Sequence, residues 1–294
     1  MTTEPDESGA GDASPTVAAP ATSQPGRGLR GLLAPAVVLL VVAALAIAAM
    51  GGGSDEPAAA PPADEPSPAA TDDPVDDIAD DLVVEPDPDA EAAQEQEQLD
   101  EEAVRQQLAA LATRDPDDPR ALGDADAPVV MIEWADFFCP FCGVFARETE
   151  TVLIERYVES GLLRIEWRDL PFQGEEALLA ALGGQAAAEQ DAFWGYHEAM
   201  FAEDLRRGDP RFGRDFLLEV AGNLDLDVTA FDAALDDPEL LERVQTDALL
   251  AQALNFTGTP AFLVEGRPVV GAQPLDVFVN LVENAVVEAG AELP

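Results

Sequence analysis

Residues 129–142 of the 294-residue chain read VVMIEWADFFCPFC, and this stretch decides the fold. Its first part, Val129–Ala135, is a short run of apolar and β-favouring residues, which is typical of a buried central strand. The run is followed by Cys139-Pro140-Phe141-Cys142, where proline suits the first position of a helix because its missing N–H costs nothing there. The stretch therefore predicts a strand that leads into a helix with two thiols at its start.

Cys139 and Cys142 are the only cysteines in the chain, and their spacing allows a small disulfide at the helix start. A helix N-terminus favours a thiolate, and Cys-X-X-Cys motifs lower the pKa of the reactive thiol to about 3.5–7.5. We expect the Cys139 sulfur to face solvent and to attack, and Cys142, one turn further in, to be buried and to resolve the mixed disulfide. The pair indicates redox exchange; a metal site with further ligands and a structural staple are the alternatives.

The apolar patterns outward from this stretch alternate between helices and strands. The expected elements are a helix from Pro140 to about Ser160 closed by Gly161, a strand at 162–168, helices within about 175–255, strands at 261–264 and 268–270 that turn at Gly266-Arg267, and a last helix at 274–289. The helical block is expected to break at Gly208-Asp209-Pro210, Gly222-Asn223 and Asp236-Asp237-Pro238. This order predicts an α/β fold over residues 121–294 with a helical insertion.

Three motifs follow one another in this part of the chain. They are the stretch from Asp126 to Cys142, then Phe193-Trp194-Gly195-Tyr196-His197 followed by Met200-Phe201, and finally Gly258-Thr259-Pro260-Ala261-Phe262. Together they resemble the DsbA-like thioredoxin-fold disulfide oxidoreductases, in particular the membrane-anchored bacterial branch of that family. The resemblance covers about residues 121–290 and implies a thioredoxin fold with an inserted helical domain.

The resemblance implies a role for each residue of the Cys-X-X-Cys motif. Cys139 matches the nucleophilic cysteine and Cys142 the resolving one. Pro140 and Phe141 match the dipeptide between them, which tunes the redox potential. The oxidising prototype of the family has a histidine where Phe141 stands, so a cationic imidazole beside the thiolate is missing here and the oxidising strength stays open.

The resemblance also implies roles away from that motif. Thr259 and Pro260 match the pair that forms a cis peptide bond beside the disulfide, where proline leaves the preceding backbone free to pair with a substrate strand. Glu133 matches a buried acid that assists proton transfer from Cys142; a strand-end carboxylate that reaches water is the alternative. His197, the only histidine, lies on an apolar helical stripe and is expected to be a core-edge residue with a satisfied ring nitrogen.

The N-terminal part has a different composition. Residues 1–30 are rich in Pro, Ala, Ser, Thr, Gly and acid and are expected to be a disordered cytoplasmic tail. Residues 31–50 include a charge-free apolar run that is long enough for a transmembrane helix across a hydrocarbon core of about 30 Å. Arg27 and Arg30 precede this run, so the positive-inside rule places the N-terminus in the cytoplasm and the rest outside. A cleaved secretory signal is the alternative, and it also exports the C-terminal part.

Two segments connect that run to the folded part. Residues 51–89, made of Pro, Ala, Gly and acid, are expected to form a disordered linker that charge repulsion keeps extended. Residues 90–120 are expected to contribute a solvated helix and a connector, because strong helix formers with a weak apolar stripe fill the first part.

Charge excludes one class of function. The formal net charge is −44, all fifteen basic residues are arginine, and nucleic-acid binding needs a basic surface. We expect neither a cofactor nor a metal. The sequence thus predicts a single-pass, extracytoplasmic thiol–disulfide oxidoreductase that acts on exported proteins with cysteines and works with a membrane redox partner. A reductase or isomerase with the pair kept reduced is the enzymatic alternative, and a metal-binding or structural Cys-X-X-Cys module is the non-catalytic one.

Overall fold

The computed structural model describes residues 88–294, with side chains from Gln94 onward. The expected cytoplasmic tail and transmembrane helix, and the acidic linker except for its last two residues, lie outside the described residues. Within residues 88–294, no helix is both long and apolar enough to cross a membrane.

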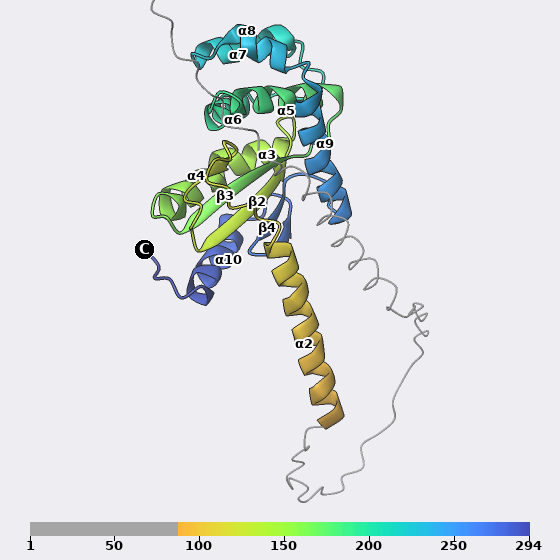
Figure 1. Ribbon diagram of the computed structural model, residues 1–294, viewed down its shortest axis with the longest axis vertical. Coiled ribbons are helices and arrows are strands. Elements are labelled where there is room, and N and C mark those ends of the chain that lie inside the picture. Colours follow the sequence, from red (N-terminus) through yellow and green to blue (C-terminus); the bar gives the residue numbers. More distant parts are fainter. Residues whose placement is uncertain (1–87) are drawn as a thin grey trace, which may run out of the picture. The chain divides into compact units, whose positions relative to one another are not determined.

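The described elements alternate between strands and helices in an α/β order (Figure 1). In chain order they are α2 (Pro88–Ala109), β1 (Ala121–Leu122), β2 (Val129–Ala135), α3 (Pro140–Val144), η1 (Phe145–Glu150), α4 (Thr151–Leu153), η2 (Ile154–Val158), β3 (Leu163–Asp169), α5 (Glu175–Ala188), α6 (Phe193–Ala202), α7 (Arg214–Asn223), α8 (Val228–Ala234), α9 (Pro238–Ala253), β4 (Ala261–Val264), β5 (Arg267–Val270) and α10 (Leu275–Glu288).

The strands form one mixed sheet in the order β1-β3-β2-β4-β5. Strands β2 and β3 are parallel, and the other neighbouring pairs are antiparallel. Every residue of β2 is buried, so the stretch expected to be a central strand is one. In the register, Glu133 lies opposite Trp167 on β3 and Phe262 on β4. The short strand β1 was not expected.

A continuous helix follows β2 and covers one face of the sheet. It runs from α3 to η2, and η1 and η2 within it are π-helical turns, which occur frequently at functional sites. Gly161 follows it with a φ of 74°, a left-handed conformation that glycine adopts without strain, so the helix ends where the sequence indicated.

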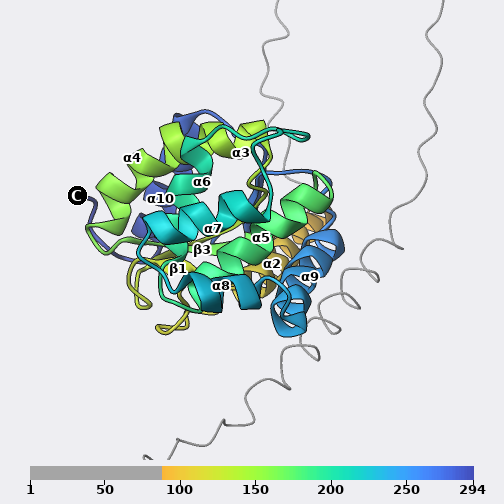
Figure 2. The same ribbon diagram turned by 90° about the horizontal axis from the view of Figure 1, so that it is seen from above.

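The helical insertion consists of α5 to α9, and Figure 1 shows α7 and α8 stacked on α5 and α6. In the perpendicular view of Figure 2, α9 lies beside α5 and α8. The three expected breaks lie between helices or at a helix end. A further break at residues 189–192 was missed: it separates α5 from α6, and Asp191 adopts a φ of 58° there.

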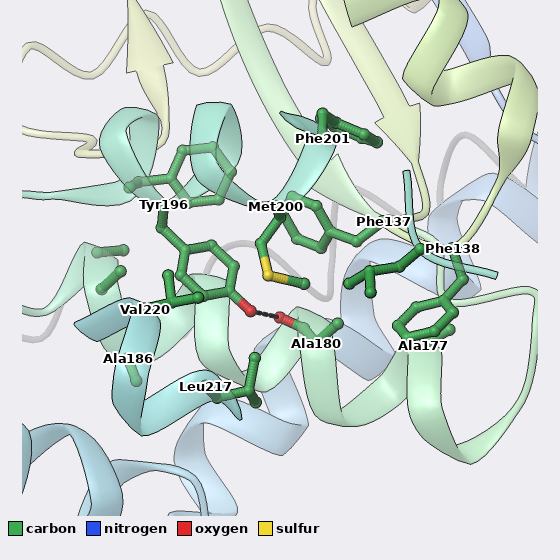
Figure 3. Packing of buried hydrophobic residues seen from close by; sticks show 14 of the residues in the cluster. Phe137, Phe138, Ala177, Ala180, Ala186, Tyr196, Met200, Phe201, Leu217 and Val220 are labelled. Atoms are coloured by element: carbon green, nitrogen blue, oxygen red, sulfur yellow. Dashed lines mark hydrogen bonds between the residues drawn. The ribbon is translucent and has the colours of Figure 1, made fainter. Parts of the chain in front are cut away.

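The insertion shares its apolar core with the cysteine loop (Figure 3). Phe137 and Phe138, in the turn between β2 and α3, are buried in it together with residues of α5, α6 and α7. Tyr196 of α6 donates a hydrogen bond of 2.8 Å from its hydroxyl to the carbonyl of Ala180 on α5. The aromatic pair before Cys139 therefore anchors the site to the helical layer.

The β4–β5 hairpin turns at Glu265–Gly266, one residue earlier than expected. Arg267 already pairs with Val264 as part of β5. Gly266 has a φ of 78°, and a Cβ there would collide with the carbonyl of Arg105 on α2. The turn needs glycine because α2 packs directly against it.

A network of buried charges lies on the face of β3 away from the α3–η2 helix. The carboxylate of Glu166 is 3.2 Å from Arg164 and 2.8 Å from Arg168, and it accepts hydrogen bonds from the backbone N–H groups of Thr113 and Arg114. Its side chain has no exposed area. This carboxylate fastens the segment after α2 to the sheet.

Replacing Glu166 by Gln should lower the free energy of unfolding by about 3–5 kcal/mol, because two buried guanidinium groups lose their shared counter-charge. Urea unfolding of the reduced protein measures this loss. The matched control is Glu189→Gln in the exposed pair of Glu189 with Arg243, which should cost less than about 1 kcal/mol. Equal effects of the two substitutions would contradict a structural role of the buried network.

Candidate active site

The two thiols lie at the junction of β2 and α3. Cys139 is the N-cap of α3, with extended φ and ψ of −80° and 119°, and Pro140 occupies the first turn. A tight turn precedes it: Asp136 accepts the N–H of Phe138 at its carboxylate, at 2.7 Å, and the N–H of Cys139 at its carbonyl, at 3.0 Å. This turn aims the Cys139 sulfur at the start of the helix.

Both cysteines are free thiols and both are buried. Cys139 is 5% exposed and Cys142 is 0% exposed. Cys139 is the more accessible of the two, but the expectation that its sulfur faces solvent is wrong. The reason is a loop distant in sequence: in its thiol form, Cys139 donates a hydrogen bond of 3.2 Å from its S–H group to the carbonyl of Thr259.

That loop contains the peptide bond between Thr259 and Pro260, which is cis. Pro260 is buried and leads directly into β4, and its carbonyl accepts the N–H of Gly271 at 2.8 Å after β5. The structure thus brings the Cys-X-X-Cys motif and the Thr259–Pro260 pair together.

The two sulfurs have opposite electrostatic environments. The hydrogen bond from the Cys142 thiol has the largest effect on the pKa of Cys139. With the Thr259 side chain and the N–H groups of Cys142 and Phe141, it lowers the pKa of Cys139 to about 5 against the opposing effect of burial. Burial, together with the neighbouring Cys139, raises the pKa of Cys142 well above its ordinary value. At neutral pH the reduced site therefore holds a thiolate at Cys139 and a thiol at Cys142.

Apolar side chains remain exposed on the segments that form the site. Phe141, between the cysteines, is 65% exposed, and Phe172, in the loop after β3, is 58% exposed. Val270 of β5 is also exposed and pairs with Ala261, next to Pro260. We call Phe141, Phe172 and Val270 the apolar rim.

Asp136 is a functional candidate that sequence reasoning missed. Its carboxylate accepts the N–H groups of Phe138, Phe172 and Gln173, each at 2.7–2.8 Å. Burial raises its pKa to about 6 although these hydrogen bonds oppose the shift, and the negative charge of Cys139 adds to the rise. An aspartate three residues before the first cysteine was the available signal, but the Phe172 loop that it binds is distant in sequence.

Glu133 is 1% exposed, so the alternative of a carboxylate that reaches water is wrong. Burial raises its pKa well above the ordinary value, and the nearby carboxyl of Glu150 on η1 raises it further. Glu133 in turn contributes to the raised pKa of Cys142. Glu150 is also buried, and the sequence analysis did not identify it. A single acid within a helix gives no indication of which distant residue it will contact.

His197 is buried on α6, and the expectation of a satisfied ring nitrogen is wrong. Its Nε2 has no hydrogen-bond partner in the part of the chain that the structure describes, and it lies 3.5 Å from Oε2 of Glu150. Burial lowers the pKa of His197 to about 3, so its ring is neutral at physiological pH. In the described part of the chain, no three His, Cys, Asp or Glu side chains are placed to hold a metal ion.

Comparisons with known proteins place this arrangement among related chains. A family model described as Thioredoxin matches residues 114–284. A probable disulfide bond formation protein D of Bacillus anthracis is 29% identical over 152 residues, which are 50% of this chain and 70% of that protein. The crystal structure of oxidised BdbD from Bacillus subtilis has a TM-score of 0.54 at 23% identity, covering 57% of this chain and 92% of that one, and is a likeness of fold.

A longer kind of protein also matches. The Na(+)/H(+) antiporter NhaA 3 of Salinispora tropica is 35% identical over 179 residues, which are 60% of this chain. The chain spans about a quarter of that antiporter's length, since the match covers 26% of it. Taken together, the matches confirm the thioredoxin fold and the resemblance to DsbA-like proteins that the three motifs predicted.

The depressed pKa of Cys139 predicts an acidic midpoint for its reactivity. In the reduced protein, the rate of alkylation by iodoacetamide should rise through a midpoint near pH 5, with the label on Cys139 by mass spectrometry. The urea-unfolded protein is the control and should show a midpoint of about 8.5 with both thiols labelled. A native midpoint equal to that of the control, or equal labelling of both cysteines, would overturn the assignment of the thiolate.

Proposed function

Because this chain belongs to the thioredoxin family, we propose that it is a protein thiol–disulfide oxidoreductase that exchanges disulfides with exported proteins through Cys139 and Cys142. The observation that carries the proposal is the asymmetry of the two thiols: Cys139 caps α3 next to the cis Thr259–Pro260 bond and has a pKa lowered to about 5, whereas Cys142 has no exposed area and burial raises its pKa well above the ordinary value. A thiol of low pKa is a thiolate when it attacks and a good leaving group when it is displaced.

The exchange proceeds in two displacements. In the oxidising direction, a client thiolate attacks Sγ of Cys139, the Cys139–Cys142 bond breaks, and the sulfur of Cys142 leaves with the electron pair and takes up a proton. The second client thiolate then attacks the client sulfur of the mixed disulfide, and Cys139 leaves as a thiolate. The client loses two electrons and the protein gains them. In the reducing direction both steps run backwards, and Cys142 must lose its proton before it attacks.

The apolar rim supports an unfolded client as the substrate. Phe141, Phe172 and Val270 are exposed apolar side chains on the segments that form the site, and an extended client segment with apolar side chains would fit such a surface. The backbone next to Pro260 offers the pairing edge for that segment. Asp136 acts as a positioning residue, because its hydrogen bonds to Phe172 and Gln173 hold one side of the rim beside Cys139.

The direction of electron flow is the point on which the enzymatic alternatives differ. The thiolate of Cys139 is stabilised by hydrogen bonds from uncharged groups, and Phe141 adds no charge to it. The reduction potential of the Cys139–Cys142 pair orders the alternatives, since an oxidant must have a higher potential than its client and a reductase a lower one.

Replacing Cys142 by Ala should trap the client. The attacking thiol remains and the resolving thiol is gone, so covalent adducts should accumulate on non-reducing gels of the full chain. Cys139→Ala, the matched control, should give few adducts and no turnover. Equal trapping by both variants, or by neither, would contradict the division of roles and favour a non-catalytic Cys-X-X-Cys module.

We further propose that residues 31–50 anchor the protein in the cell membrane as a single span, with the N-terminus in the cytoplasm and the redox domain outside. Support comes from the charge-free run and from Arg27 and Arg30 just before it. A membrane redox partner would then restore the state of the cysteine pair after each turnover.

The proposed topology predicts the result of protease treatment of cells whose cell wall has been removed and whose cell membrane is intact. Residues 121–294 should be cleaved or released while a tag on the N-terminus stays protected, because the membrane shields only the cytoplasmic side. A cytoplasmic marker protein is the control for cell integrity. Protection of the redox domain together with the tag would refute export.

A further inference from the structure

Cys142 needs a route for its proton, and the structure provides no direct one. The residue is 0% exposed, and no solvent reaches it. Each turnover nevertheless adds or removes one proton at its sulfur. The buried groups around Glu133 are therefore candidates for the path of that proton.

Three buried polar side chains form a chain of neighbours that starts beside Cys142. Glu133 lies on β2, Glu150 on η1 and His197 on α6, and they are 1%, 2% and 5% exposed. We call them the buried acid–histidine chain. Among the described residues, each has a buried side-chain atom without a hydrogen-bond partner among fixed donors and acceptors: Glu133 Oε2, Glu150 Oε1 and His197 Nε2.

The orphaned oxygens indicate a shared proton. The carboxyls of Glu133 and Glu150 lie within hydrogen-bond reach of each other. Two ionised carboxylates only accept, so they can form such a bond only when one of them carries a proton. Among the described residues, no arginine pairs with either side chain, in contrast to Glu166 on the neighbouring strand, which contacts two arginines. Burial raises the pKa of both acids, which keeps that proton in place at neutral pH.

The end of the buried acid–histidine chain that is away from Cys142 lies at a surface pocket. Glu150 and His197 both line a surface pocket of about 500 Å³ between the α3–η2 helix and α6. The charged side chains on its border are Arg147, Glu155 and Glu198, all exposed. Arg147 donates a hydrogen bond to the carbonyl of Phe201 at 2.6 Å and lies 3.7 Å from Asp204. Its guanidinium group therefore pairs with these groups and not with the buried acid–histidine chain. Water in the pocket can therefore exchange protons with the chain at His197.

Packing does not explain these three residues. A buried polar atom without a partner costs about 1–3 kcal/mol, so the chain lowers the stability of the fold unless protons bridge its members. The spacing of 3.5 Å between Glu150 Oε2 and His197 Nε2 needs only a small side-chain movement to become a hydrogen bond.

We propose that Glu150 and His197 relay the proton of Cys142 between Glu133 and the water of this pocket. The inference rests on the proposed function. When Cys142 attacks Cys139, its S–H proton passes to the carboxyl pair, the new Cys139–Cys142 bond forms, and the partner sulfur leaves as a thiolate. The pair then releases one proton through the ring of His197 to water. In the opposite direction the same path delivers one proton to the departing Cys142.

The two displacements can be separated with an aromatic disulfide. Reduced full-length protein mixed with dithiobis(nitrobenzoate) should release one coloured thiolate as Cys139 attacks and a second as Cys142 resolves the mixed disulfide. Glu150→Gln and His197→Ala should slow the second phase about tenfold or more and leave the first unchanged. Glu198→Gln is the matched control, since Glu198 lines the same pocket as an exposed acid, and it should change neither phase.

Two further readouts separate a relay from a structural effect. Imidazole added to His197→Ala should restore the second phase, because the pocket adjoins the vacated site, and should not restore Glu150→Gln. The second phase of Glu150→Gln should rise about tenfold for each pH unit, as hydroxide replaces the missing acceptor, while the wild-type phase varies less.

The outcomes distinguish the two proposals. A wild-type protein that releases no coloured thiolate contradicts the proposed function itself. Two normal phases in the wild type, with an unchanged second phase in Glu150→Gln and His197→Ala, overturn the relay alone. Equal slowing of both phases in either variant also overturns it, because a general disturbance of α3 would act on Cys139 as well.

Discussion

The geometry of the site depends on how β2 ends, and one carboxylate governs that end. Asp136 binds the N–H of Phe138 and thereby turns the chain so that Cys139 caps α3. The same carboxylate binds the N–H groups of Phe172 and Gln173, which follow β3. A strand end, a helix start and a distant loop therefore meet at a single buried anion. Burial raises the pKa of this carboxyl, and the negative charge of Cys139 adds to the rise.

The sheet buries charge on both faces, and it does so in two different ways. On one face of β3, Glu166 is compensated by Arg164, Arg168 and two backbone N–H groups, which makes it a structural anion. On the other face, Glu133 on β2 neighbours a second acid, Glu150, and pairs with no arginine of the described residues. Burying an acid without a cation favours its protonated form, because the low-dielectric surroundings penalise charge. Glu133 also contributes to the raised pKa of the Cys142 thiol, so the protonation states of this acid and this thiol influence each other.

Sequence reasoning recovered what local patterns encode and missed what distant segments bring. The strand at 129–135, the helix closed by Gly161 and the breaks in the insertion carry local signals, namely β-favouring apolar runs, glycine and proline. The break at 189–192 lacks both residues, so it was missed. The burial of Cys139 was also missed, since the Thr259 loop that covers it is more than a hundred residues away.

The amino-acid sequence by itself determined that two cysteines stand at a helix start, most of the order of strands and helices, and most of the turn-forming residues, because spacing and periodicity act over a few neighbouring positions. Through the resemblance to a family, the sequence also predicted that Thr259 and Pro260 form a cis peptide bond beside the cysteines. Only the tertiary structure decided which acids are paired with arginine and which with another acid, because charge compensation depends on distances between segments. Glu150 and His197 gained significance in this way: neither has a distinctive signal in its own helix, and only the packing of η1 and α6 removes both from water, with Glu150 beside Glu133 and His197 3.5 Å from Glu150.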